Sequence, residues 1–225
     1  MSNEDARSRI LQAAGPVFAE KGFQAATVRE ICQAAEVNLA AINYYFGDKE
    51  RLYIETVKRA QQLLVERVPM PSWAAGTSAA DRLATFIETM LTRMLEEHQA
   101  PWQSRLMMRE ILDPSGACQE LVEEYFRPQF LVLLNILREL AAEDVADYEL
   151  EQLAFSVVGQ CVYYRVGRAI VGCLIPEPQR VARYSTPQLA AHITRFSLAA
   201  VRGLHAGADV PSETISQRSW REAVR

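Results

Sequence analysis

Residues 39–46, LAAINYYF, carry side chains suited to contact with base pairs and phosphates. The amide of Asn43 can donate and accept at once, which is the pattern that pairs with adenine in the major groove. The phenol of Tyr45 suits a phosphate oxygen or a thymine methyl group, and Lys49 lies close behind as a cation for a phosphate. This chemistry is that of nucleic-acid recognition, provided that the segment forms an exposed helix.

Two short helices joined by a tight turn are predicted to position these side chains. Thr27 and Glu30 have the spacing of a capping box, which predicts a helix over about 28–35. Asn38 can cap a second helix over about 39–46, since Gly47 follows it. A helix this short depends on packing for its stability, so its inner face belongs to a core and its outer face is open.

Longer helices are expected before and after this pair. Apolar residues recur at helical spacing over 5–21, before a helix-ending Gly22, and a further helix is expected over about 48–68. We expect Ile42 and Tyr44 to face the core. Four helices in this order are typical of a helix-turn-helix unit.

The remaining chain is expected to form a second, larger helical domain. Segment 69–78, PMPSWAAGTS, is rich in proline and small residues and predicts a linker. The fold class is therefore all-α, with a three-helix helix-turn-helix domain at 1–52, a linking helix at about 48–68, and a C-terminal domain at 69–225. In that domain we expect helices over about 78–98, 101–112, 117–142 with a kink or break at Pro128, 148–175 and 187–206.

Composition excludes several classes of protein. The net charge is −4, and eight basic residues balance eight acidic ones within the first 60, so any affinity for nucleic acid depends on where the cations lie. No signal-peptide pattern and no uncharged apolar run of about 18 residues is present, which predicts a cytoplasmic protein with no membrane partner. The four cysteines lack metal-ligand spacing; we expect buried thiols, with a thiol sensor as the alternative. The three histidines likewise predict no metal site.

Residues 7–59, with FAEKGFQAATVREICQAAEVNLAAINYYFGDKERLY at their centre, resemble the DNA-binding domain of the TetR family of bacterial transcriptional regulators. The resemblance rests on Phe18, Gly22 and Phe23, on the Thr27 cap and on the YYFGDKE ending. It implies that the second helix of the pair reads DNA. The candidate DNA contacts are Thr27, Arg29, Asn38, Leu39, Ala40, Ala41, Asn43, Tyr45 and Lys49.

Two positions depart from the family pattern. Many members carry glycine where this chain has Glu36, so a non-glycine residue is expected in the left-handed αL conformation, at a cost of about 1 kcal/mol. Many carry tyrosine where this chain has Asn43, which predicts a different base preference. The operator of a relative therefore does not transfer to this chain.

The segments SRLMMREILDPSG, EEYFRPQF and GQCVYYRVGRAI resemble the CecR-like subgroup of the same family. The resemblance implies a homodimer formed by the last two long helices and a small-molecule cavity in each subunit. The candidate dimer contacts are Gly159, Val166, Ile170, Ile193, Phe196, Ala200 and Leu204. The candidate ligand contacts are Phe86, Met90, Met94, Trp102, Met107, Tyr125, Phe126, Tyr164 and Arg168.

Alternatives remain for these C-terminal residues. Methionines and aromatics line adaptable cavities, but they also fill helical cores. Arg165 and Arg168 either pair with carboxylates or meet an acidic or polar ligand. The candidate carboxylates for such pairs are Glu110, Glu120 and Glu123.

Three functions are compatible with the sequence to different degrees. The leading hypothesis is a dimeric regulator, in its simplest form a repressor, that binds a pseudo-palindromic double-stranded operator and responds to an unidentified small-molecule effector. The second is a constitutive or protein-controlled regulator with a filled C-terminal core. The third is an enzyme, which is disfavoured because the chain has no P-loop, no H-E-x-x-H and no G-x-S-x-G motif. We expect no catalytic residue and no cofactor.

Overall fold

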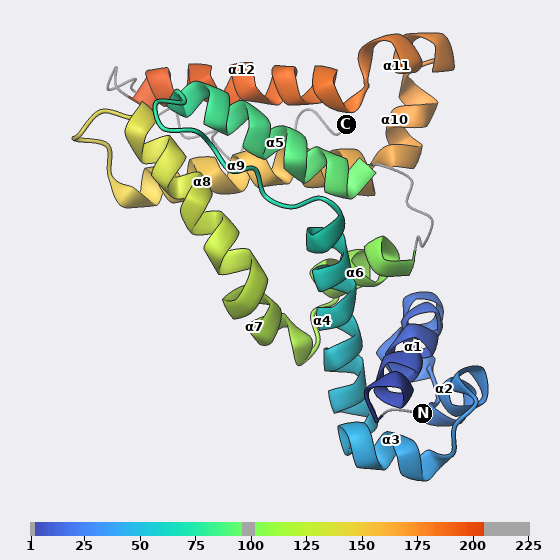
Figure 1. The fold of residues 1–225 in the computed structure, drawn as a ribbon. Helices are drawn as coiled ribbons and strands as arrows, with labels where there is room; N and C mark the ends of the chain where they lie inside the picture. Colours follow the sequence, from blue (N-terminus) through green and yellow to red (C-terminus); the bar gives the residue numbers. More distant parts are fainter. Residues whose placement is uncertain (1–2, 96–101, 205–225) are drawn as a thin grey trace, which may run out of the picture.

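The computed structural model describes residues 3–95 and 102–204, and within these ranges the chain is helical without strands (Figure 1). The all-α prediction is confirmed. The helices are α1 (Asn3–Ala25), α2 (Val28–Ala35), α3 (Leu39–Phe46), α4 (Lys49–Arg67), α5 (Ala79–Leu95), α6 (Trp102–Leu112), α7 (Ala117–Leu121), the π-helical turn η1 (Val122–Phe126), α8 (Arg127–Leu140), α9 (Asp147–Val166), α10 (Arg168–Leu174), α11 (Glu177–Arg183) and α12 (Thr186–Leu204).

Local side-chain caps define the first helices. The Thr27 hydroxyl accepts from the Glu30 amide at 3.3 Å, and the Glu30 carboxylate accepts from the Thr27 amide at 3.1 Å. Asn38 Oδ1 accepts from the Ala41 amide at 3.0 Å at the start of α3. Asp48 caps α4 in the same way. The capping box and the α3 cap are thus confirmed, and each satisfies a backbone donor that the helix leaves unpaired.

Glu36 occupies the turn between α2 and α3 with φ 53° and ψ 47°, as expected from its departure from glycine. We expect Glu36→Gly to raise the free energy of unfolding by about 0.5–1 kcal/mol, because glycine has no Cβ to strain in this conformation. Urea unfolding at fixed protein concentration measures the effect. Gln33→Gly in α2 is the control and should lower the free energy of unfolding by a similar amount. If the free energy of unfolding rises with Gln33→Gly, or falls with Glu36→Gly, the backbone at Glu36 is not strained.

The regular part of the first helix ends at Gly22, as predicted, because its φ of 76° and ψ of 175° are not helical. A short further helical stretch follows this kink and reaches Ala25. The positive φ favours glycine at this position, and a Cβ would also lie 2.7 Å from Nη1 of Arg109, so that the end of this flexible side chain would have to move.

Two long C-terminal segments are divided. The segment expected over 117–142 with a kink or break at Pro128 is α7, η1 and α8, and the division before α8 falls next to Pro128, which lies in the first turn of α8. The second division is contrary to the prediction. The segment expected over 148–175 breaks at Gly167 into α9 and α10. The short helix α11 follows and was not predicted. The expected helix ends at 96–98 and 205–206 lie outside the described residues.

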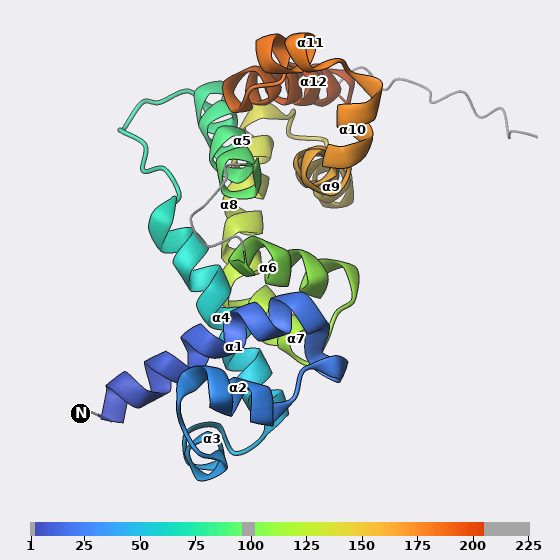
Figure 2. The same ribbon diagram turned by 90° about the vertical axis from the view of Figure 1, so that its right-hand side faces the viewer.

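Two hydrophobic cores hold the molecule together, and they do not divide at the linker. One core joins α1–α4 with α6 and α7, through Leu106, Met107, Ala117 and Leu121. The other joins α5, α8, α9 and α12. Figure 2 shows α6 and α7 between the α1–α3 unit and the upper helices, beside α4. The DNA-reading candidate helices therefore share a core with elements that lie beyond residue 69.

Candidate nucleic-acid interface and cavities

Helix α3 lies at one end of the molecule with its outer face open (Figure 1). Ile42 and Phe46 anchor it, with 1% and 6% of their surfaces exposed. The candidate contacts Asn38, Leu39 and Asn43 are exposed. Ala41 and Tyr45 are partly buried against the core, and Ala40 is exposed beside them. The arrangement presents one amide-bearing face of a short helix to a partner.

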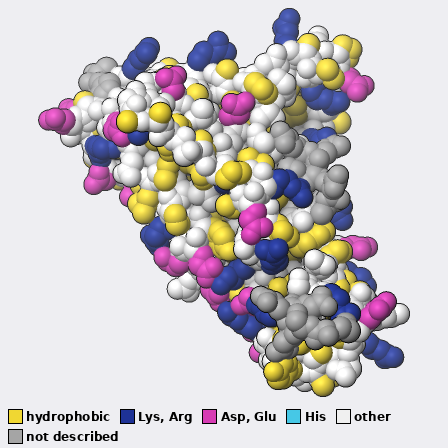
Figure 3. Space-filling model, viewed as in Figure 1, with side chains coloured by type: hydrophobic (Ala, Val, Ile, Leu, Met, Phe, Trp, Pro, Cys, Tyr) yellow, Lys and Arg dark blue, Asp and Glu magenta, His cyan; other side chains and the backbone are white. Residues whose placement is uncertain are grey.

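Tyr44 is not a core residue, and that expectation was wrong. It is 73% exposed, while Tyr45 is half-buried, and the two rings meet edge to face with centroids 5.0 Å apart. Tyr45 is three residues from Ile42 and shares its helix face, whereas Tyr44 is two residues away and does not. Figure 3 shows the hydrophobic side chains that gather at the α3 end of the molecule. Tyr44 therefore joins the candidate contact face.

Cationic side chains flank α3 at the start of α2. Thr27 and Arg29 are exposed there. The ammonium group of Lys49 donates to the Gln24 carbonyl at 3.3 Å and lies 4.7 Å from the centroid of the Phe23 ring. These contacts hold Lys49 against the segment that leads into α2. A phosphate at the amino end of α2 would meet free helix amides and these cations together.

The negative charge of Glu30, in the first turn of α2, would repel a phosphate at this helix end. The hydrogen bond from Lys21 lowers the pKa of Glu30 to about 2, and the bonds from the Thr27 backbone and hydroxyl contribute to the shift. Because the lowered pKa lies far below neutrality, the carboxylate stays charged until the pH falls to about 2. Its charge is paired with Lys21, so Arg29 and Lys49 remain as the cations of this surface.

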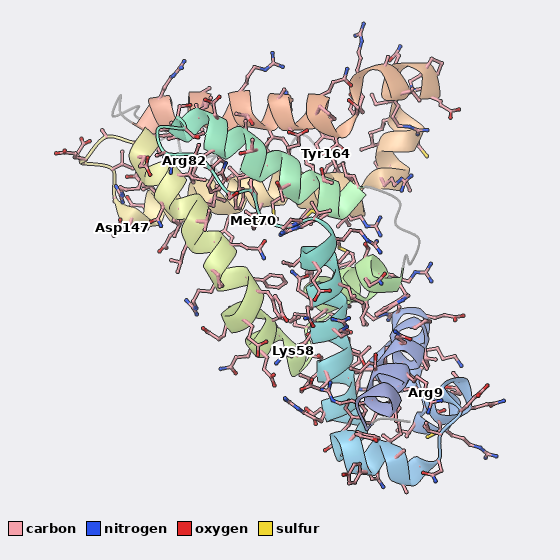
Figure 4. All side chains as sticks on the ribbon, viewed as in Figure 1. Arg9, Lys58, Met70, Arg82, Asp147 and Tyr164 are labelled. Carbon is pink, nitrogen blue, oxygen red and sulfur yellow. The ribbon has the colours of Figure 1, made fainter. Side chains whose placement is uncertain are left out.

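Helix α4 is tied by ion pairs to the helices beside it. Lys58 binds Glu120 at 3.0 Å and Glu124 at 2.5 Å, and Arg51 binds Glu120 at 2.7 Å. Figure 4 shows Lys58 between α4 and the α7 segment. The hydrogen bond from Lys58 is the main cause of the lowered pKa of Glu120. Exposed pairs add little stability singly, but a connected set fixes how α4 lies on α7 and η1.

A buried carboxylate connects the same elements from inside. Glu110 of α6 is 2% exposed and accepts from the Tyr53 hydroxyl at 3.0 Å and from the Ser115 amide at 2.8 Å. Burial, followed by the charge of Glu110, raises the pKa of Tyr53. Glu110 and Glu120 thus have other partners, as does Glu123, which binds Arg127. Arg165 makes no ion pair with a carboxylate of the described residues, so the ion-pair alternative is not supported for it.

The structure divides the candidate ligand residues between two cavities and the cores. The methionine cavity, about 100 Å³, lies among α4, α5, α6, η1, α8 and α9; it is lined by Gln61, Leu64, Met90, Arg93, Met94, Ser104, Met107, Met108, Ile111, Phe126, Gln129 and Arg165. The α10 cavity, about 790 Å³, includes Tyr164 and Arg168. Phe86 lies in the closed second core, while Trp102 and Tyr125 pack against the first.

Sequence reasoning missed Arg93, the buried cation of the methionine cavity. Its spacing to Met90 and Met94 places all three on one face of α5, and that spacing was available from the sequence. The partners that hold its side chain come from residues distant in the chain, which a periodic pattern does not reveal.

The candidate dimer residues fall on α9, α10 and α12. Val166, Ile170 and Phe196 are 48%, 56% and 55% exposed, and Gly159 is exposed too. Ala200 and Leu204 are half-buried against their own core, and Ile193 is fully buried, so it has no surface to offer a partner. Among the exposed large side chains, Phe155 and Tyr163 extend the same apolar surface.

In the part of the chain that the structure describes, no helix has the length and apolarity needed to cross a membrane. Within the same residues, no group of three or more His, Cys, Asp or Glu side chains could hold a metal ion.

Comparisons with known proteins identify the family. Residues 79–201 match the C-terminal domain of the HTH-type transcriptional dual regulator CecR, and residues 10–56 match the bacterial regulatory proteins of the tetR family. The chain is 25% identical over 184 residues to the dual regulator CecR of Shigella flexneri, which covers 76% of this chain and 80% of that protein. It is 24% identical over 133 residues to the probable HTH-type transcriptional regulator YttP of Bacillus subtilis (strain 168), covering 59% and 63%.

A solved tetR-family regulatory protein from Rhodococcus RHA1 has the same fold, with a TM-score of 0.63 at 19% identity, over 89% of this chain and 98% of that one. The two matched regions carry the helix-turn-helix and most of the second domain. The chain belongs to the TetR family of DNA-binding transcriptional regulators, with a C-terminal domain of the CecR type.

Proposed function

We propose that the chain is a homodimeric, ligand-responsive repressor in the cytoplasm, that it has no catalytic activity, and that α3 reads each half of a pseudo-palindromic operator. The observation that carries the proposal is the open face of α3, with Asn38, Leu39 and Asn43 exposed on a helix anchored by Ile42 and Phe46. A helix held in this way can enter a major groove. Arg29 and Lys49 flank it for the phosphates on either side.

A dimer through the apolar surface of α9 and α12 supports the operator geometry. A two-fold axis presents two α3 helices, and half-sites are then expected about 34–36 Å apart. A small molecule that binds the DNA-released arrangement better would shift the dimer away from DNA, with a coupling of about 1–3 kcal/mol. Helix α4 supports this coupling, because it runs from α3 to the linker before α5.

Fluorescence anisotropy with DNA from upstream of the gene that encodes the protein tests the proposal. We expect selective binding over a scrambled duplex, with an affinity that falls steeply as salt rises, since phosphate contacts release counterions. Equal affinity for both duplexes, or no binding at low salt, contradicts the proposal.

Asn43→Ala is expected to relax base preference while the dimer persists. The amide is the group on α3 best suited to adenine, and a good bidentate contact contributes about 1–3 kcal/mol of discrimination. Anisotropy with single-base operator variants measures the change. Gln62→Ala is the control, because it removes an exposed amide from the second half of α4 and should leave selectivity unchanged. An Asn43 variant that keeps full selectivity removes Asn43 from the reading face.

A regulator controlled without a small molecule is the second candidate. The methionine cavity, about 100 Å³, is below the usual size of a drug-binding pocket and favours it. The α10 cavity, about 790 Å³, falls within that usual size. Operator affinity that no small molecule changes would support the second candidate.

A further inference from the structure

Arg93 is a buried cation with an unused donor group. It is 8% exposed, and its Nε donates to the Val68 carbonyl at 2.7 Å while Nη1 donates to Gln129 Oε1 at 2.8 Å. Its Nη2 is buried without a hydrogen-bond partner among the described residues. A buried polar group without a partner is costly, so this nitrogen is the point at which a further acceptor would be stabilised.

Among the described residues, no carboxylate compensates the positive charge around Arg93. Arg165 lines the same methionine cavity, and the lining contains no Asp or Glu among the described residues. Neither arginine forms an ion pair with a described carboxylate. Burial lowers the pKa of both guanidinium groups, and Arg168 and Arg105 add to the effect at Arg165. An anion is the partner that this charge distribution favours.

The rest of the lining is apolar and adaptable. Four of the six methionines of the chain line the cavity, together with Leu64, Ile111 and Phe126. The volume of about 100 Å³ is less than the ~150 Å³ that holds benzene in an engineered cavity, so the occupant is small or displaces methionine side chains. The cavity therefore suits a short apolar body attached to a negative head.

We propose that the methionine cavity binds a small organic carboxylate, with the carboxylate on Arg93 and Arg165 and the apolar part against the methionines. The inference rests on the proposed function, since it names the effector class of that regulator. A planar guanidinium and a carboxylate match in geometry as well as in charge.

The position of Arg93 connects this cavity to the DNA-reading helices. Val68, whose carbonyl accepts from Arg93, is the residue that ends α4, and Gln61 and Leu64 of α4 line the cavity. The opposite end of α4 begins shortly after α3. A carboxylate that draws the guanidinium toward itself changes the contact that holds the end of the linking helix.

Isothermal titration calorimetry of the full chain with hexanoate and benzoate, each against its amide, tests the inference. We expect each acid to bind at least about tenfold more tightly than its amide, since the charged head gains hydrogen bonds to charged donors that a neutral amide makes more weakly. Arg93→Gln and Arg165→Gln should each weaken the acids by a similar factor. Arg183→Gln, an exposed arginine of α11, is the matched control and should leave binding unchanged.

Arg93→Gln also removes the hydrogen bond to the Val68 carbonyl, so a loss of binding in this variant could reflect a folding defect. Arg165→Gln is the second variant for this reason, because the desolvated guanidinium of Arg165 pairs with no described carboxylate. Acids and amides that bind alike, acids that do not bind, or an Arg165 variant with full affinity overturn the inference. An operator titration on the same preparation separates the two proposals. If the protein binds the operator but not the acids, only the proposed carboxylate effector is overturned. If it does not bind the operator, the proposed regulator function is overturned.

Discussion

Phe196→Glu is expected to yield a monomer that binds the operator at least about 100-fold more weakly, because a monomer loses the second, linked half-site, which in a dimer strengthens binding by about 10²–10⁴. Phe196 is 55% exposed on α12, a helix that contacts α9, whose Phe155, Tyr163 and Val166 are exposed too. A carboxylate buried in an apolar interface has no partner to offset its lost hydration, which opposes association. Sedimentation velocity gives the mass and anisotropy the affinity.

Leu112→Glu is the matched control for this substitution. Leu112 ends α6 and is 64% exposed, but it does not lie on α9 or α12. The control should remain dimeric with unchanged operator affinity. A dimeric Phe196 variant with full affinity would show that the interface lies elsewhere.

Phe18→Ala is expected to lower the free energy of unfolding by about 3–5 kcal/mol, which is a large part of the stability of a typical protein. The Phe18 side chain is fully buried, and its ring meets Tyr53 of α4 edge to face at a centroid distance of 5.0 Å. Truncation leaves a cavity where α1 packs on α4. Urea unfolding should show a lower midpoint with an unchanged slope.

Val17→Ala provides the comparison at the preceding position. Val17 is half-buried, so its truncation removes less buried surface and should cost about 1 kcal/mol. Equal losses for the two variants would mean that the packing of Phe18 on Tyr53 contributes nothing specific. Operator binding by Phe18→Ala at low temperature should persist, because none of the α3 contacts is altered.

Elements encoded by local chemistry could be predicted from the sequence. Thr27, Asn38 and Asp48 cap helices in the structure, and each does so through bonds within three residues. The αL conformation of Glu36 follows from the tight turn it occupies. These interactions involve neighbours in the chain, so the residues themselves specify the result.

Features that depend on distant contacts could not be predicted in the same way. The break at Gly167 is an exception among these features: a Cβ there would come within 2.9 Å of the carbonyl of Tyr163, only four residues earlier, but nothing in the apolar pattern marks the break. The partners of Arg93 come from Val68 and Gln129, 25 and 36 residues away. The exposure of Tyr44, in contrast, could have been predicted from the sequence, because its spacing of two residues from Ile42 places it on another face of α3.

The shared core of α1–α4 with α6 and α7 has a consequence for engineering. Leu106 and Leu121 are fully buried among the residues of the DNA-reading unit, so a fragment cut at the linker would expose apolar surface and lack part of its interior. Hybrid regulators that graft this reading head onto another sensor should therefore carry α6 and α7 with it. The exchangeable module is defined by packing, and it is discontinuous along the chain.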